Sequence, residues 1–319
     1  MLVLNEDDTR KALPWPELIE AIAAMFVAGC VTPVRHHHAV DVPGEAEATM
    51  LLMPAWVPGE HMGVKILNLF PDNHLRALPT IIGTYLLSSA RTGDMLAMVE
   101  GGELTARRTA ATSALAARYL AREDAETMLM VGAGRLSLNL MQAHAVTRPL
   151  KRFFVWARNA GKAEDCAAEA RRIGLDAIAV TDLAEAAGSA DIISCATLSS
   201  EPLIRGDWLR PGTHLDLVGA FKPTMRESDD ACIRRASVWV DTRAGAMTEG
   251  GDIVQPLASG VLAKADIRAE LAELVAGQRP GRSTTDEITL FKSVGAALED
   301  LAGAILAYNQ VQGQRQAAR

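Results

Sequence analysis

The most constraining feature of this sequence is a glycine turn that directly follows a short apolar run. The run spans residues 127–133, and the turn reads Gly132-Ala133-Gly134-Arg135-Leu136-Ser137. In such a turn the first glycine permits a tight bend, the second lets backbone approach a pyrophosphate, and a small third residue fits where helix meets strand. The helix that follows would offer unpaired N–H groups and partial positive charge to phosphates. The pattern indicates a dinucleotide site; an ordinary strand-to-helix turn is the alternative.

The segments after this turn alternate between buried strands and helices. Helices are expected through residue 145 and at 162–173 and 182–187, and strands at 152–157, 177–180, 191–195, 213–219 and 237–241. Alternation of this kind is typical of βαβ units and a parallel, doubly wound sheet.

The end of the second strand bears on which dinucleotide binds. A carboxylate at this place would bind the ribose hydroxyls of NAD, but the chain has Arg158, with Lys162 one turn further on. A guanidinium suits a 2′-phosphate. The sequence therefore favours NADP(H), with NAD(H) possible, unless Arg158 is only a solvated charge. Thr197 is a further expected cofactor contact.

The first 105 or so residues have a different pattern. Strands are expected at 31–42, 49–53, 63–70, 80–88 and 95–100, which predicts an antiparallel or mixed sheet. A helix at 109–120 connects the two parts, and a helix at 293–306 could pack back on the first. We therefore expect a discontinuous domain of residues 1–115 and 294–319 and a Rossmann domain of residues 116–293.

Composition excludes several classes of partner and site. The 319 residues carry a net charge of −7, which argues against nucleic acid and anionic membranes, since both need a basic face. The start of the chain lacks the basic and apolar regions of a signal peptide, and no apolar run is long enough to span a membrane. A cytoplasmic location is expected. Of the adjacent His36, His37 and His38, only the first and third could share a strand face, and no accompanying ligand motif is present, so no metal is expected.

Three cations in the first part are candidate anion ligands. Arg35 follows a Pro-Val pair, Lys65 lies within an apolar strand, and Arg108 opens an alanine-rich helix. A buried ammonium needs a partner, which an anionic substrate could provide. Spacing alone does not show that the three converge, and solvated surface charges remain the alternative.

The chain resembles the ornithine cyclodeaminase/mu-crystallin family. Its matches include residues 104–113 and 289–295, within which 108–113 (RTAATS) and 291–295 (FKSVG) are the specific stretches. Further matching segments, in chain order, are 52–54, 63–66, Asn68, 71–73, the Gly132 turn, 214–219 and 249–252.

The resemblance implies a Rossmann domain inserted into a substrate-binding and dimerisation domain, and hence a homodimer. It also implies that Arg35, Lys65 and Arg108, with the hydroxyl of Thr80, hold the carboxylate of an amino or imino acid. Lys65 and Arg108 are the expected catalytic residues. Other implied cofactor contacts are Val218, Gly219 and Ser293 beside the nicotinamide and Thr109 near the phosphates.

Departures from the family pattern indicate which reaction to expect. Cyclodeaminases and alanine dehydrogenases of the family carry an Asp where this chain has Phe221, and cyclodeaminases also carry a carboxylate where it has Leu51 and Leu52. A phenyl ring can neither accept a proton nor pair an ammonium, although it could pack ring methylenes. The chain looks more like the reductases that convert Δ1-pyrroline-2-carboxylate or Δ1-piperideine-2-carboxylate to L-proline or L-pipecolate.

Three readings of the function stay open at this point. The alternatives to imine reduction are ornithine cyclodeamination or alanine-type dehydrogenation, and a mu-crystallin-like protein that binds NADPH and a small ligand. The proton on the imine nitrogen could come from a substrate iminium, from water or from Lys65. Neighbouring cations would disfavour an iminium.

Overall fold

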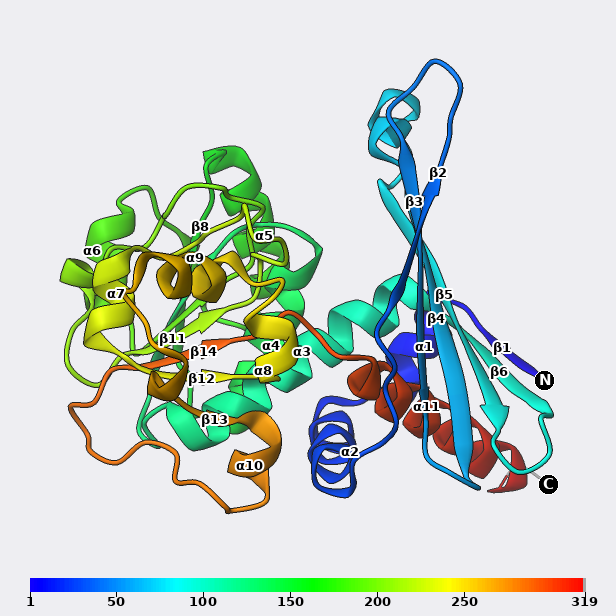
Figure 1. Ribbon diagram of the computed structural model, residues 1–319. Coiled ribbons are helices and arrows are strands. Elements are labelled where there is room, and N and C mark those ends of the chain that lie inside the picture. Colours follow the sequence, from blue (N-terminus) through cyan, green and yellow to red (C-terminus); the bar gives the residue numbers. More distant parts are fainter. Residues whose placement is uncertain (318–319) are drawn as a thin grey trace. The chain divides into compact units, whose positions relative to one another are not determined.

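The computed structural model describes residues 1–317 and divides into two compact units (Figure 1). The first unit comprises Met1–Arg108 and the chain from Ala297 on, and the second comprises Thr109–Ala296. The chain passes from one unit to the other within helix α3 (Gly101–Leu120) and again just before α11 (Ala297–Ala317). These divisions lie at 108/109 and 296/297, compared with the expected 115/116 and 293/294.

The second unit contains an eight-stranded sheet in the order β13-β12-β14-β11-β10-β7-β8-β9, in which all the pairings are parallel. Its strands are β7 (Thr127–Val131), β8 (Arg152–Trp156), β9 (Ala177–Ala179), β10 (Ile192–Cys195), β11 (His214–Leu217), β12 (Ser237–Val240), β13 (Ile267–Glu270) and β14 (Thr289–Lys292). This confirms the parallel, doubly wound sheet. The chain order reverses between β7 and β10, which are neighbours in the sheet.

Helices pack around this sheet (Figure 1). In chain order they are α3, α4 (Arg135–Thr147), α5 (Ala160–Arg172), α6 (Leu183–Ser189), η2 (Gly206–Trp208), α7 (Asp230–Arg235), α8 (Arg243–Ala246), α9 (Gly251–Ser259), η3 (Lys264–Asp266) and α10 (Leu271–Val275). Strands β10, β11 and β14 are buried along their whole length, although they carry polar residues such as Ser194, Asp216 and Lys292.

The first unit contains a six-stranded mixed sheet in the order β1-β6-β5-β4-β3-β2. Its strands are β1 (Leu2–Leu4), β2 (His36–Val40), β3 (Ala48–Trp56), β4 (His61–Leu69), β5 (Ile81–Ser89) and β6 (Met95–Glu100). Neighbours from β2 to β6 are antiparallel, and β1 joins β6 in parallel. The sequence predicted an antiparallel or mixed sheet, and the sheet is mixed because β1, which was not predicted, joins β6 in parallel.

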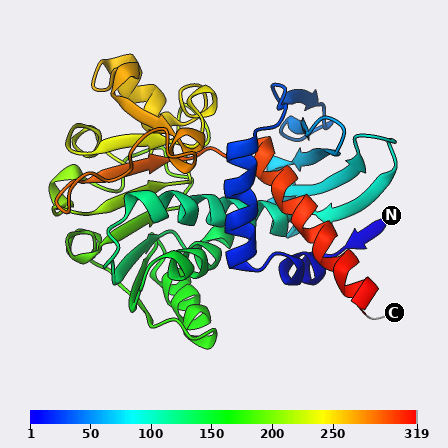
Figure 2. The same cartoon turned by 90° about the horizontal axis from the view of Figure 1, so that it is seen from below.

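One face of this mixed sheet carries helix α11. The helix contacts β3, β4, β5 and β6 and also packs against α2 (Trp15–Ala28), as Figure 2 shows from below. The unit also contains α1 (Glu6–Ala12) and η1 (Pro71–Arg76). Side chains that point toward α11, such as Met53, Tyr85 and Val99, are buried.

The opposite face of the mixed sheet keeps apolar side chains partly exposed, because alternate residues of each strand point to it. These residues are Met50, Leu52, Pro54, Trp56, Val64, Ile66, Ile82, Leu86 and Met98. Among residues 1–317, no helix has both the length and the hydropathy needed to cross a bilayer.

Candidate functional site

The glycine turn after β7 has a backbone geometry that only small residues allow. Gly132 has a φ of +118°, and a Cβ there would lie 2.7 Å from the carbonyl oxygen of Ala196. A Cβ on Gly134 would meet no atom within 4 Å, so this position opens onto unfilled space. The buried Ser137 hydroxyl donates to the carbonyl of Gly132 at 3.0 Å and accepts from the N–H of Gly134 at 3.1 Å. Ser137 therefore fastens the turn to the start of α4.

A pocket of about 350 Å³ opens at this turn, where the chain order of the sheet reverses. Crevices at such reversal points, outside the carboxyl ends of parallel strands, are where open α/β sheets bind ligands. The lining residues are Gly132, Ala133, Gly134, Trp156, Ala157, Arg158, Asn159, Lys162, Ala196, Thr197, Leu198, Ser199 and Leu203. The open backbone at Gly134 fits a closely approaching pyrophosphate.

The end of β8 supplies the cationic part of this pocket. Arg158 and Lys162 are exposed and line it, and no carboxylate is among the lining residues. Asn159 accepts a hydrogen bond from the N–H of Lys162 at 3.1 Å, which caps α5 and fixes where this helix begins. The local electrostatics suit an anionic group such as a phosphate.

Other residues expected at the cofactor lie in the same unit but not on the pocket wall. Arg135 and Leu136 open α4, Val218 and Gly219 follow β11, Ser293 follows β14, and Thr109 lies in α3. Val218, Gly219, Ser293 and Thr109 are buried.

The sequence did not single out a buried carboxylate that holds this region together. Glu227 accepts a hydrogen bond from the N–H of Thr197 and another from the N–H of Gly219, each at 2.7 Å. Its neighbours Asp252 and Lys292 are also fully buried. Asp252 and Lys292 lie in segments that the family resemblance marked, but nothing in the sequence around Glu227 distinguishes it from a surface acid.

In the first unit, two of the three expected cations lie together. Lys65 of β4 is 1% exposed, and its Nζ lies 2.6 Å from Oδ2 of Asp300 in α11. Nε of Arg108 donates to Oδ1 of the same Asp300 at 3.0 Å, and its Nη1 donates to Oε2 of Glu299 at 2.7 Å. We call Lys65, Arg108, Glu299 and Asp300 the charge quartet. These four side chains form a connected buried cluster with no net formal charge.

Burial and pairing shift the pKa values of the quartet in different directions. Burial lowers the pKa of Lys65 to about 8, partly offset by Asp300. Burial opposes the charged forms of Arg108 and Asp300 as well, but there the opposite charges prevail: the pKa of Arg108 is raised, and the pKa of Asp300 is lowered. All three are therefore ionised at neutral pH.

The remaining substrate candidates lie on other segments. Arg35 is half-buried just before β2, and Thr80 is exposed just before β5. Phe221 is half-buried in the second unit, where the Nζ of Lys222 lies 5.9 Å from the centre of its ring. Glu299 and Asp300 were missed, although two adjacent acids in an alanine-rich helical pattern were a usable signal.

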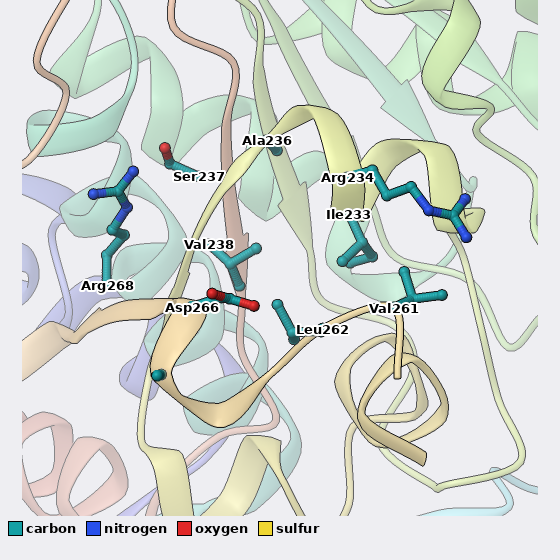
Figure 3. A pocket seen from close by; sticks show the side chains of 10 residues that line it. Ile233, Arg234, Ala236, Ser237, Val238, Val261, Leu262, Asp266 and Arg268 are labelled. Atoms are coloured by element: carbon teal, nitrogen blue, oxygen red, sulfur yellow. The ribbon is translucent and has the colours of Figure 1, made fainter. Parts of the chain in front are cut away.

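Figure 3 shows a second pocket in the second unit, of about 520 Å³. It lies at the amino ends of β12 and β13, the end of the sheet away from the glycine turn. Arg234 and Arg268 lie on opposite sides of it, and their guanidinium groups do not converge (Figure 3). The pocket is open but offers no focused group of ligand-binding atoms.

Within residues 1–317, no cluster of three or more His, Cys, Asp or Glu side chains is arranged to hold a metal ion. His36 and His38 are exposed on the same face of β2, with ring centroids 6.4 Å apart.

Comparison with known proteins finds similarity along nearly the whole chain. The model of the ornithine cyclodeaminase/mu-crystallin family matches residues 4–315. The Δ1-pyrroline-2-carboxylate reductase of Paracoccus denitrificans is 38% identical, over 93% of this chain and 93% of its own. The Thermococcus litoralis Δ1-pyrroline-2-carboxylate reductase, solved in complex with NADH and L-proline, is 35% identical with a TM-score of 0.91 over 98% of both chains. An archaeal alanine dehydrogenase dimer with bound NAD is 26% identical with a TM-score of 0.89, over 99% of this chain and 97% of its own.

We expect Asp300→Asn to lower the free energy of unfolding by about 3–5 kcal/mol, since removing one member of a buried ion pair leaves its partners uncompensated. Urea denaturation measures the change. The control is Asp7→Asn, because Asp7 pairs with Arg10 on the surface and should contribute less than about 1 kcal/mol. Equal effects for the two variants would show that the quartet does not stabilise the fold.

Proposed function

This chain belongs to the ornithine cyclodeaminase/mu-crystallin family, as its motifs indicate, and we propose that it reduces the C=N bond of a cyclic imino acid with a nicotinamide cofactor. The substrate is Δ1-pyrroline-2-carboxylate or Δ1-piperideine-2-carboxylate, and the product is L-proline or L-pipecolate. Relatives named Δ1-pyrroline-2-carboxylate reductase, at 38% and 35% identity, support the reaction type.

The choice of reaction rests on Phe221. Cyclodeamination and amino-acid dehydrogenation need a group that handles a substrate amine, and the family members that perform them place an Asp at this position. Phe221 offers an apolar ring, which suits the methylenes of a cyclic imine and cannot exchange a proton. An imine reductase has less need of that carboxylate, since its substrate carries no primary amine to be removed.

In this proposal the pocket at the glycine turn holds the cofactor. Gly132, Gly134 and the start of α4 would receive the pyrophosphate, and Arg158 with Lys162 would receive a 2′-phosphate, which makes NADP(H) the preferred form and NAD(H) the second. When bound, the reduced nicotinamide supplies a hydride. Thr197, Val218, Gly219 and Ser293 would border it, with Thr109 near the phosphates.

The substrate carboxylate is assigned to Arg35, Lys65 and Arg108, with the hydroxyl of Thr80. A guanidinium can bind a carboxylate through two parallel hydrogen bonds, and an ammonium has three N–H donors. Fixing the carboxylate orients the imine carbon, which must come within about 3–3.5 Å of the hydride donor. Lys65, with a pKa of about 8, can also exchange a proton at Nζ near neutral pH, whereas an arginine stays charged.

We further propose that the protein is a homodimer that uses the exposed face of the mixed sheet. That face presents apolar side chains from β3, β4, β5 and β6, which water solvates poorly. A dimeric alanine dehydrogenase among the similar structures supports this assembly.

The function is tested by following oxidation of NADPH and NADH with purified protein. Pyrroline-2-carboxylate or piperideine-2-carboxylate should be reduced, and ornithine with NAD should release neither proline nor ammonia. Ornithine turnover would identify a cyclodeaminase, and turnover of pyruvate with ammonia would identify a dehydrogenase. Cofactor binding without turnover of any of these would identify a binding protein.

The assignment of the 2′-phosphate is tested by Arg158→Asp. We expect kcat/KM with NADPH to fall roughly 10- to 100-fold, because a hydrogen bond to a charged group contributes about 1.5–3 kcal/mol, while kcat/KM with NADH holds or rises. Arg152→Asp, at the opposite end of β8, is the matched control. If the NADPH/NADH ratio did not change in Arg158→Asp, the guanidinium would have no phosphate role.

The dimer proposal is tested by Ile82→Lys, which places a charge on the exposed sheet face. Sedimentation should show a dimer for the wild type and a shift to monomer for the variant. Ile81→Lys is a close control, because Ile81 is 49% exposed and Ile82 50% exposed, yet the two side chains point to opposite faces of β5. If both variants remained dimeric, the interface would not lie on this face of the mixed sheet.

A further inference from the structure

The buried carboxylate of Glu227 connects two loops at the carboxyl edge of the parallel sheet. It accepts hydrogen bonds from the N–H and from the hydroxyl of Thr197, each at 2.7 Å, and from the N–H of Gly219, also at 2.7 Å. Thr197 follows β10, and Gly219 follows β11. One side chain therefore fixes the exits of two adjacent strands.

The backbone around Glu227 holds the same loop at further points. The carbonyl of Glu227 accepts from the N–H groups of Leu203 and Ile204 at 2.9 and 3.0 Å, and the N–H of Arg226 donates to the carbonyl of Ser199 at 2.8 Å. Thr197, Ser199 and Leu203 all line the pocket at the glycine turn. Residues 226–227 thus bind the outer side of one pocket wall.

This wall also packs against the glycine turn and Gly219. A Cβ on Gly132 would collide with the carbonyl of Ala196, and a Cβ on Gly219 would lie 2.1 Å from the carbonyl of Thr197. The backbone of residues 196–197 is therefore in close contact with the backbone at Gly132 and Gly219. A shift of Thr197 would therefore change the shape of the pocket directly.

Behind Glu227 lies a second buried carboxylate and one ammonium. Oδ1 of Asp252, in α9, accepts from the N–H groups of Glu227 and Ser228 and from the hydroxyl of Ser228. Oδ2 of Asp252 makes no hydrogen bond and lies 3.6 Å from the Nζ of Lys292 in β14, which donates to the carbonyl of Leu217 at 3.1 Å. Glu227, Asp252 and Lys292 thus form a buried group of two acids and one base.

We propose that Glu227 is a positioning residue for the cofactor pocket: it holds Thr197 and Gly219 in the arrangement that binds the dinucleotide. This inference rests on the proposed function, which places a dinucleotide in this pocket. Glu227 itself is fully buried and is not among the residues that line the pocket. Glu227 acts through the three groups that donate hydrogen bonds to it, which are two backbone N–H groups and one hydroxyl.

The three hydrogen bonds depend on the ionisation of Glu227, because all three partners donate and the ionised carboxylate offers only acceptors. Burial and the neighbouring Asp252 raise the pKa of Glu227 to about 7, while Lys292 opposes them. A further titratable group that interacts with Glu227 is the thiol of Cys195 in β10, whose pKa is raised well above the usual value by burial, so the thiol stays neutral. Protonation below pH 7 removes an acceptor site, so dinucleotide affinity should rise as pH increases through about 7.

The test measures binding of NADH alone, without substrate, by quenching of tryptophan fluorescence; Trp156 lines the pocket. NADH is used because it lacks a 2′-phosphate, a group of the kind that itself titrates near pH 6. Wild-type affinity should increase by up to about tenfold per pH unit below pH 7 and level off above it. Glu227→Gln should bind roughly tenfold or more weakly at pH 8 and lose most of the pH dependence.

The matched control is Glu287→Gln, since Glu287 also accepts an N–H and a hydroxyl from one residue, Ser283, but in a loop away from the pocket. It should bind NADH like the wild type. Thermal melting reports folding of each variant. If Glu227→Gln does not fold, Thr197→Val removes only the hydroxyl bond and should still weaken binding. Wild-type affinity and pH dependence in the Glu227→Gln variant, or wild-type affinity in the Thr197→Val variant, would overturn the inference. A wild type that binds neither NADH nor NADPH would overturn the proposed function as well.

Discussion

The pairing of Lys65 and Arg108 with Asp300 and Glu299 is the interaction on which the first unit depends. An isolated charge in an apolar interior costs several kcal/mol, so neither the cations nor the acids could be buried without the other pair. The cations belong to the first part of the chain and the acids to its last helix. The C-terminal helix must therefore return to the first sheet, which makes that unit discontinuous and leaves residues 109–296 between its two parts.

The second unit uses a buried carboxylate for a comparable purpose. Asp300 accepts a hydrogen bond from the guanidinium of Arg108 and forms an ion pair with the ammonium of Lys65. Glu227 instead accepts hydrogen bonds from backbone N–H groups in the loops after β10 and β11. In both units the acid lies beneath the groups assigned to ligand binding and fixes their positions. A site held in this way loses little conformational entropy on binding, because its donors are already ordered.

The parts of the fold that were predictable depend on local sequence. The glycine turn and β7 follow from apolar runs next to turn residues, and they were predicted within two residues. Strand β14 was missed as a strand because 289–292 is short and carries a lysine; only its position between β11 and β12 buries it. The need of Lys65 for a partner was also readable, but the partner was not, since Arg108 and its acids stand 191 and 192 residues apart.

The pairing of Lys65 and Arg108 with two acids changes how the proposed substrate would be recognised. With Arg35, Lys65 and Arg108 alone, the site would attract any small anion and would repel a protonated imine nitrogen beside the carboxylate. Glu299 and Asp300 offset the positive potential of Lys65 and Arg108, because the potentials of closely paired opposite charges largely cancel away from the pair. The quartet then contributes oriented N–H donors more than net charge. A substrate whose carboxylate and basic nitrogen are bonded to the same carbon matches such a site better than a simple carboxylic acid does.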